Sequence, residues 1–79
     1  MTDISLTDLA TDNPDILDLQ PRLEDEDAGV RRIALIELAD LEDPDALPWL
    51  VHTLANDLSA DVRAEAARLL EAWEEGLLF

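Results

Sequence analysis

The second half of the chain carries apolar residues at the spacing of two helices joined by a short turn. Apolar positions recur every three or four residues along residues 44–58, and do so again along residues 60–76. The first stripe is Leu47, Leu50, Val51, Leu54 and Leu58, and the second is Val62, Ala66, Leu69, Leu70 and Trp73. A helical hairpin with an apolar face on each helix needs a neighbour to bury both faces.

The residues that flank these two segments are typical of helix ends. Asp43 is a predicted N-cap, with Pro44 at the first helical position, where the missing N–H costs nothing. Ser59 is the predicted N-cap of the second helix, which we expect to end at Gly76.

The neighbouring hairpin is encoded just upstream, because the pattern repeats. Val30, Arg31, Ala34 and Leu38 recur 32 residues later as Val62, Arg63, Ala66 and Leu70. In the preceding helix, Ile16, Leu19 and Leu23 recur 31 residues later as Leu47, Leu50 and Leu54. One helical hairpin per period of this length is typical of an α-solenoid.

The first hairpin is predicted to begin at Asn13-Pro14 and to contain an interruption. Pro21 removes a backbone hydrogen bond, so we expect a kink or a break near Gln20. The second helix of this hairpin is predicted from about Ala28 to Ala39. Its stripe is Val30, Ile33, Ala34, Leu38 and Leu41, widened by Leu35 and Ile36.

Segments 43–50 (DPDALPWL) and 61–70 (DVRAEAARLL) resemble HEAT repeats, in particular the short HEAT-like repeats of phycocyanobilin lyase subunits. The resemblance extends over about residues 13–74 and implies an all-α fold, a short α-solenoid of helical hairpins with about two HEAT-like repeats. The expected organisation is a leader or cap over residues 1–12, repeat 1 over 13–43, repeat 2 over 44–76 and an apolar tail over 77–79. Solenoids usually need roughly three repeats, so we expect capping segments, association, or one end of a longer solenoid.

The charge of the chain disfavours several classes of partner. Twenty acidic residues face five arginines and no lysine, which gives a net charge of −15. Nucleic acid and anionic membranes need a basic footprint that is absent here. The acidity favours a partner protein that is basic or offers an apolar segment, although charge of this size also serves solubility alone.

The residue types give no sign of catalytic or cofactor chemistry. The chain has no cysteine, which excludes disulfides, thiolate metal sites and a cysteine nucleophile. We expect no cofactor and no metal, because the acidic clusters at residues 24–27 and 40–45 lack the spacing of a calcium loop. The start of the chain lacks the pattern of a signal peptide, and no apolar run is as long as a membrane span, so a cytoplasmic location is predicted.

Arg31 and Arg63 occupy the same position of the two repeats. The resemblance implies that this arginine pairs with an acidic residue in the turn of an adjacent repeat, forming a ladder. Asp27 and Asp61 are the predicted partners, and Asp57 is a further candidate. A ligand-binding role for the arginines is the less favoured alternative, and exposed pairs of this kind contribute only ~0–1 kcal/mol.

Trp49, His52 and Asn56 are predicted to share one outer face of their helix, off the apolar stripe. Bulky aromatic residues outside a core are enriched at interaction surfaces, so these three are the candidate protein-binding residues. The alternatives are that Trp49 packs against the first repeat and that His52 is simply solvated. Trp73 lies on its stripe and is predicted to be core.

The sequence favours a non-catalytic protein–protein interaction module, that is an adaptor, scaffold or assembly-factor domain with an acidic surface. One alternative, implied by the resemblance, is a maturation or lyase-associated subunit that handles a cofactor enzyme or a tetrapyrrole. Another is a self-associating structural domain, in which the apolar tail makes a homodimer.

Overall fold

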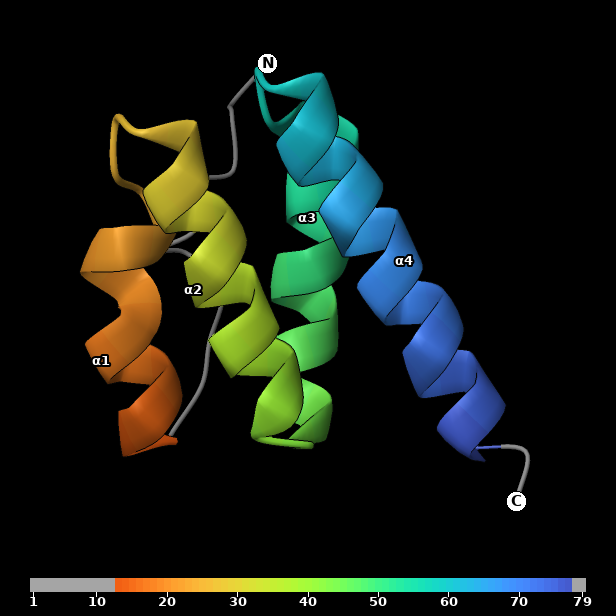
Figure 1. Cartoon of the computed structure of the whole chain (residues 1–79). Helices are drawn as coiled ribbons and strands as arrows, with labels where there is room; N and C mark the ends of the chain where they lie inside the picture. The colour runs from red at the N-terminus through yellow and green to blue at the C-terminus, as the bar shows by residue number, and fades with distance from the viewer. Residues whose placement is uncertain (1–12, 78–79) are drawn as a thin grey trace, which may run out of the picture.

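The computed structural model describes residues 13–77, which form four α-helices and one 3₁₀ turn but no strand (Figure 1). The helices are α1 (Pro14–Leu23), α2 (Ala28–Asp40), α3 (Leu47–Asn56) and α4 (Ala60–Leu77), and the 3₁₀ turn is η2 (Pro44–Ala46). The predicted all-α stack of helical hairpins is confirmed. The predicted leader or cap over residues 1–12, and residues 78–79 of the predicted tail, lie outside the described residues.

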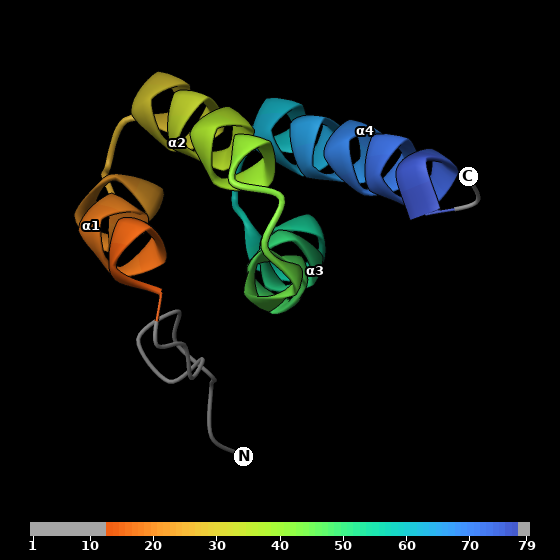
Figure 2. The ribbon, with the colours of Figure 1, turned by 90° about the horizontal axis from the view of Figure 1, so that it is seen from below.

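The four helices form two layers. Figure 2 shows α1 and α3 in one layer and α2 and α4 in the other. α1 packs on α2 and α3 packs on α4, which makes the two hairpins, and α2 packs on α4, which joins them. The two repeats therefore meet mainly through their second helices.

Polar side chains at the helix starts satisfy backbone N–H groups and also link the two hairpins. The Asn13 side chain accepts a hydrogen bond from the Asp15 N–H at 2.9 Å, and Asp43 accepts one from the Asp45 N–H at 2.9 Å. The two caps also contact each other, because Asn13 Nδ2 donates to Asp43 Oδ2 at 2.6 Å. Ser59 precedes α4 as predicted, and its Oγ accepts from the Val62 N–H at 3.4 Å. The start of repeat 1 is thus tied to the start of repeat 2 through their caps.

The helix ends follow the predictions in part. Asp43 is the N-cap and Pro44 is the first helical residue, as predicted, but the first turn is the 3₁₀ turn η2, and α3 itself starts at Leu47. α4 does not end at Gly76 but includes Leu77. α1 is not broken near Gln20, because Pro21 is followed by only two more helical residues and removes a single hydrogen bond close to the helix end.

The core lies between the two hairpins. Its largest fully buried side chains are Ile16, Leu35, Leu38, Trp49, Leu50 and Val62. The small residues Ala34 and Ala66, which occupy the same position of the two repeats, are both 0% exposed. They allow the second helices of the two repeats to approach closely. Trp73 is partly buried against this core.

The buried face of α3 is rotated relative to the predicted stripe. Leu50 is fully buried, but Val51 and Leu54 are 53% and 38% exposed, and Leu58 in the following turn is 95% exposed. Their place in the core is taken by Ala46, Trp49 and Thr53. In α2 the predicted stripe residue Ile33 is likewise 53% exposed, whereas Leu35 is buried. The spacing identified helices correctly but did not show which flank of a broad apolar face meets the next repeat.

The connection from α2 to η2 contains one residue with a left-handed backbone. Glu42 has a φ of 54° and is the one described non-glycine residue with a positive φ. Its N–H donates to the Ala39 carbonyl at 3.1 Å, which closes the end of α2. Helices often end in this way with glycine, which adopts the left-handed conformation at little cost.

Candidate interaction surfaces

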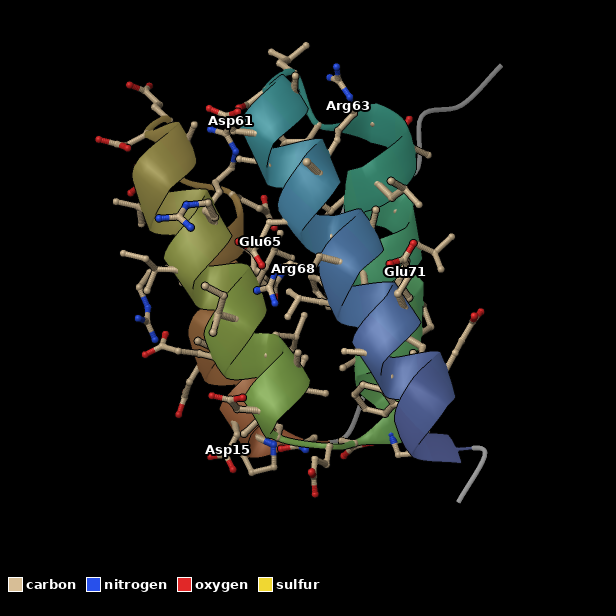
Figure 3. All side chains as sticks on the ribbon, turned by 45° about the vertical axis from the view of Figure 1, so that its right-hand side comes forward. Asp15, Asp61, Arg63, Glu65, Arg68 and Glu71 are labelled. Atoms are coloured by element: carbon tan, nitrogen blue, oxygen red, sulfur yellow. The ribbon has the colours of Figure 1, made fainter. Side chains whose placement is uncertain are left out.

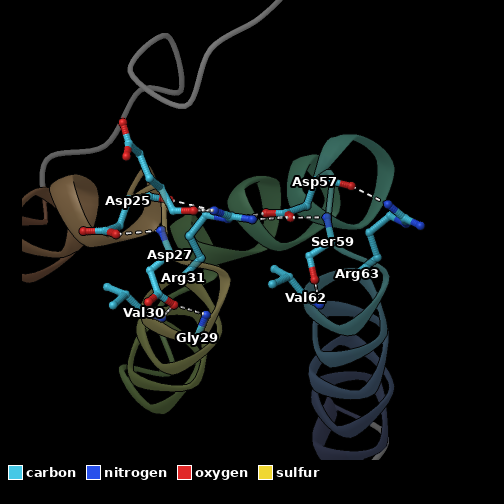
Figure 4. Close-up of polar contacts among 10 residues, drawn as sticks. Asp25, Asp27, Gly29, Val30, Arg31, Asp57, Ser59, Val62 and Arg63 are labelled. Carbon is cyan, nitrogen blue, oxygen red and sulfur yellow. Dashed lines mark hydrogen bonds and ion pairs between the residues drawn. The ribbon is translucent and has the colours of Figure 1, made fainter.

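The turn between α1 and α2 lies beside the turn between α3 and α4, and Arg31 joins them (Figure 4). Its Nε donates to Asp57 Oδ2 at 2.9 Å and its Nη2 donates to Asp57 Oδ1 at 3.0 Å. Its Nη1 donates to the backbone carbonyls of Asp25 at 2.7 Å and Glu26 at 3.0 Å. Arg31 therefore holds its own turn and pairs with the turn of the next repeat.

Asp57 is the acceptor at the centre of this arrangement. Its Oδ1 also accepts from the Ser59 N–H at 2.9 Å, and its backbone carbonyl accepts from Arg63 Nη1 at 2.5 Å. The side chains of Arg31 and Asp57 are only 15% and 9% exposed, so solvent screens their ion pair weakly. The hydrogen bond to Asp57 raises the pKa of Arg31 above its usual value, and the guanidinium stays charged at any ordinary pH.

The predicted ladder partners Asp27 and Asp61 do not pair with the arginines. Asp27 Oδ1 accepts instead from the Gly29 N–H at 2.7 Å and from the Val30 N–H at 3.4 Å, which makes it the N-cap of α2. Asp61 is exposed in the first turn of α4. Arg31 pairs with Asp57, the further candidate, because the turn of the next repeat lies directly opposite its guanidinium.

The repeat pattern contains a signal that identifies Asp57. Asp25 precedes Asp57 by 32 residues, which is the offset that separates Arg31 from Arg63. The two aspartates have the same local role, since Asp25 Oδ1 accepts from the Asp27 N–H at 2.8 Å as Asp57 Oδ1 does from Ser59. An alignment of the two repeats that included their turns would have identified Asp25 and Asp57 as equivalent residues.

A shallow pocket of about 250 Å³ lies between the two turns. Glu24 and Asp25 line it from the first turn, His52 and Asn56 line it from α3, and Leu58 borders it from the second turn. We call this feature the turn pocket. It combines acidic side chains with an apolar side chain that is almost fully exposed, and Arg31, which is paired with Asp57, lines it as well.

The structure separates the three residues predicted to bind protein together. Trp49 does not lie on an outer face, because it is 1% exposed and packs in the core between the repeats. Its Nε1 is buried without a hydrogen-bond partner. His52 and Asn56 are brought together at the turn pocket, where Asn56 Nδ2 donates to the His52 carbonyl at 3.0 Å. Binding by these two residues stays a prediction.

Every arginine of the chain is engaged within the fold. Arg22 pairs with Glu37 at 2.6 Å, and Arg32 and Arg68 both pair with Glu65. Figure 3 shows Glu65 and Arg68 on α4, on the side of the helix that faces α2. Arg31 and Arg63 are held at the turns, as described above. No arginine is left over to neutralise Glu24 or the other exposed acids.

Three aspartates of the acidic clusters accept hydrogen bonds from backbone N–H groups. Asp25, Asp27 and Asp43 each accept a hydrogen bond from a backbone N–H two residues later. In the described part of the chain, no group of three or more His, Cys, Asp and Glu residues could hold a metal ion. None of the described helices combines the length and the apolar character needed to cross a membrane.

Two stacked helical hairpins, with an arginine linking the turn of one to the turn of the next, define an α-helical repeat protein of the solenoid class. A family model for HEAT repeats matches residues 5–71, and the chain belongs to the HEAT-repeat family. Repeats of this family are commonly protein-interaction modules, and the family is generally non-catalytic. The match is to HEAT repeats in general, so the phycocyanobilin-lyase variety stays a prediction. No curated protein and no solved structure was found to match the chain.

Proposed function

We propose that this chain is a non-catalytic protein-interaction module, an adaptor or scaffold domain that binds a basic segment of a partner protein at the turn pocket. The observation that carries the proposal is the combination of exposed acids and an exposed leucine in one hollow. Glu24 and Asp25 supply the acids, and Leu58, at 95% exposure, supplies the apolar contact. A lysine or arginine of the partner would face the acids while a neighbouring apolar side chain covers Leu58.

The distribution of charge supports a basic partner. The arginines of the chain are already engaged internally, so cations that neutralise Glu24 and its neighbours must come from elsewhere. A net charge of −15 also steers a basic partner toward the domain and speeds association at low salt. Nucleic acid is disfavoured for the same reason, and the cytoplasmic location stays a prediction.

A pair of labelled peptides tests the proposal. One peptide carries alternating lysine and leucine, and the other has glutamine in place of every lysine. We expect the lysine peptide alone to bind, with an affinity that falls as salt rises from 50 mM toward 1 M (roughly a decrease in Debye length from above 10 Å to about 3 Å). The measurement is fluorescence anisotropy, with circular dichroism confirming that each variant keeps its helix content.

The site is tested with matched variants of equal charge change. Glu24→Gln should weaken peptide binding several-fold, whereas Glu71→Gln, on α4 away from the turn pocket, should leave it nearly unchanged. His52→Ala and Asn56→Ala should also weaken binding without unfolding the domain, because neither residue belongs to the core. Equal effects of Glu24→Gln and Glu71→Gln would mean a diffuse attraction between charges, and the turn pocket would not be the site.

A further inference from the structure

Repeat 2 covers one face of repeat 1, and the equivalent face of repeat 2 is open. Leu23 and Leu38 of repeat 1 are 5% and 0% exposed, whereas their equivalents Leu54 and Leu70 are 38% exposed and partly buried. Leu35, at 1% exposure, is likewise matched by the partly buried Ala67. In Figure 2, α3 and α4 form one end of the two-layer stack, and α1 and α2 form the other.

The arginines show the same difference between the two repeats. Arg31 makes two kinds of contact, one with carbonyls of its own turn and one with the carboxylate of Asp57 in the next repeat. Arg63 makes only the first kind, with the Asp57 carbonyl. Of the five arginines, it is the one without an ion pair to a carboxylate of the described residues. Figure 4 shows it at the end of a row in which Asp25, Arg31 and Asp57 precede it.

The other end of the stack, formed by repeat 1, differs from the open end in the polarity of its exposed residues. Besides Leu50, the core side chains of the segment from η2 to α3 are Ala46 of η2 and Trp49 and Thr53 of α3. The positions 31 residues earlier are Asp15, Asp18 and Arg22, and all three are exposed. At these positions of α1 this end of the described stack is therefore polar, whereas Ile33 of α2, the equivalent of Glu65, is 53% exposed. Stacking two copies head to tail would place an apolar face on a polar one, between molecules that each carry a charge of −15.

The geometry points to the open end of repeat 2 as a docking site for a helical hairpin of a different protein. We define the open end by Leu47, Val51 and Leu54 of α3 and Arg63, Ala67 and Leu70 of α4. The partner hairpin presents an apolar face and carries an aspartate or glutamate in its turn. This carboxylate accepts hydrogen bonds from the guanidinium of Arg63, as Asp57 does from that of Arg31. The proposed contact follows the pattern of the observed contact between repeat 1 and repeat 2. The open end is separate from the turn pocket.

The first test adds a hairpin of known sequence to the open end. A duplicate of residues 45–76 placed after residue 76 continues the natural repeat and carries its own aspartate at the position equivalent to Asp57. We expect a higher midpoint of urea unfolding with a single transition. Arg63→Gln should then raise the equilibrium constant for unfolding about tenfold to a hundredfold more in the extended chain than in the natural one.

Two control substitutions test whether the extra effect of Arg63→Gln comes from its pair with the added hairpin. Arg68→Gln removes an exposed pair with Glu65 and should have the same small effect in both chains. Replacing the aspartate of the duplicate by alanine should abolish the extra effect of Arg63→Gln. The inference fails if the added hairpin unfolds separately at a lower urea concentration, or if Arg63→Gln acts equally in both chains.

Sedimentation of the natural chain over a wide concentration range tests whether a second copy of the chain binds at the open end. We expect a monomer throughout, because like charge and the polar α1 face oppose self-stacking. A dimer that Arg63→Gln or Leu54→Ser dissociates would assign the open end to a second copy and overturn the inference of a different protein. Failure of this inference would leave peptide binding at the turn pocket unaffected, since the two sites use different residues.

Discussion

Replacing Asp57 by alanine should destabilise this domain more than any other single change of a surface-accessible carboxylate among the described residues. The substitution removes the bidentate pair with Arg31 and the hydrogen bond from the Ser59 N–H. It also leaves the Arg31 guanidinium, which is 15% exposed, without a carboxylate to neutralise it.

The magnitude follows from these two losses. Hydrogen bonds to charged groups contribute about 1.5–3 kcal/mol, and loss of an aspartate cap costs about 1 kcal/mol. Asp57→Ala should therefore lower the free energy of unfolding by about 2.5–4 kcal/mol. A domain of this length has a total stability of about 4–12 kcal/mol, so the loss is a large fraction of it.

The repeat supplies the matched control. Asp25→Ala removes the equivalent hydrogen bond from the Asp27 N–H but no ion pair, and should cost only about 1 kcal/mol. Asp57→Asn keeps an acceptor for Ser59 and should fall between the two. The assay is urea unfolding followed by circular dichroism. If Asp57→Ala costs no more than Asp25→Ala, the pair with Arg31 contributes nothing to stability and the reasoning is refuted.

Three further results are expected. Trp49→Ala should lower the free energy of unfolding by about 3–5 kcal/mol, because the side chain is 1% exposed; unchanged urea unfolding would mean that Trp49 is not core. Glu42→Gly should raise the free energy of unfolding by about 0.5–1 kcal/mol, because φ is positive at this residue and glycine adopts that conformation without strain. Asp40→Gly, at the helical end of α2, should lower the free energy of unfolding. The Asp45 backbone N–H lowers the pKa of Asp43, so its stabilising effect is present above about pH 4 and is lost as pH falls through the folded pKa. Asp43→Ala should flatten that part of the pH profile of stability, and an unchanged profile would contradict this.

The fold could be predicted from the sequence because its signals are local and repeated. Apolar spacing gave the helices, Asp43 and Ser59 gave their starts, and the recurrence of Val30-Arg31 as Val62-Arg63 gave the stacking of hairpins. None of these needs information about which surface faces which neighbour. They stay readable in a single sequence for that reason.

The candidate sites could be predicted only in part, because they depend on the orientation of helices relative to each other. A broad apolar face on α3 left two flanks available, and the chain buries the one with Trp49 rather than the one with Val51. Asp27 is close to Arg31 in the sequence and was therefore a reasonable partner. In the structure, however, its side chain accepts a hydrogen bond from the backbone N–H of Gly29 at the start of α2. Asp57, 26 residues from Arg31, is adjacent only after the hairpins have stacked.

The arrangement at Asp57 has a consequence for cooperativity. One side chain holds the start of α4 through Ser59 and the preceding repeat through Arg31, so fraying of the α3–α4 turn also removes its ion pair with the first hairpin. In repeat proteins, nearest-neighbour coupling of this kind decides whether units open singly or together. Amide hydrogens at the starts of α2 and α4 should consequently exchange with solvent at similar rates, as parts of one opening unit.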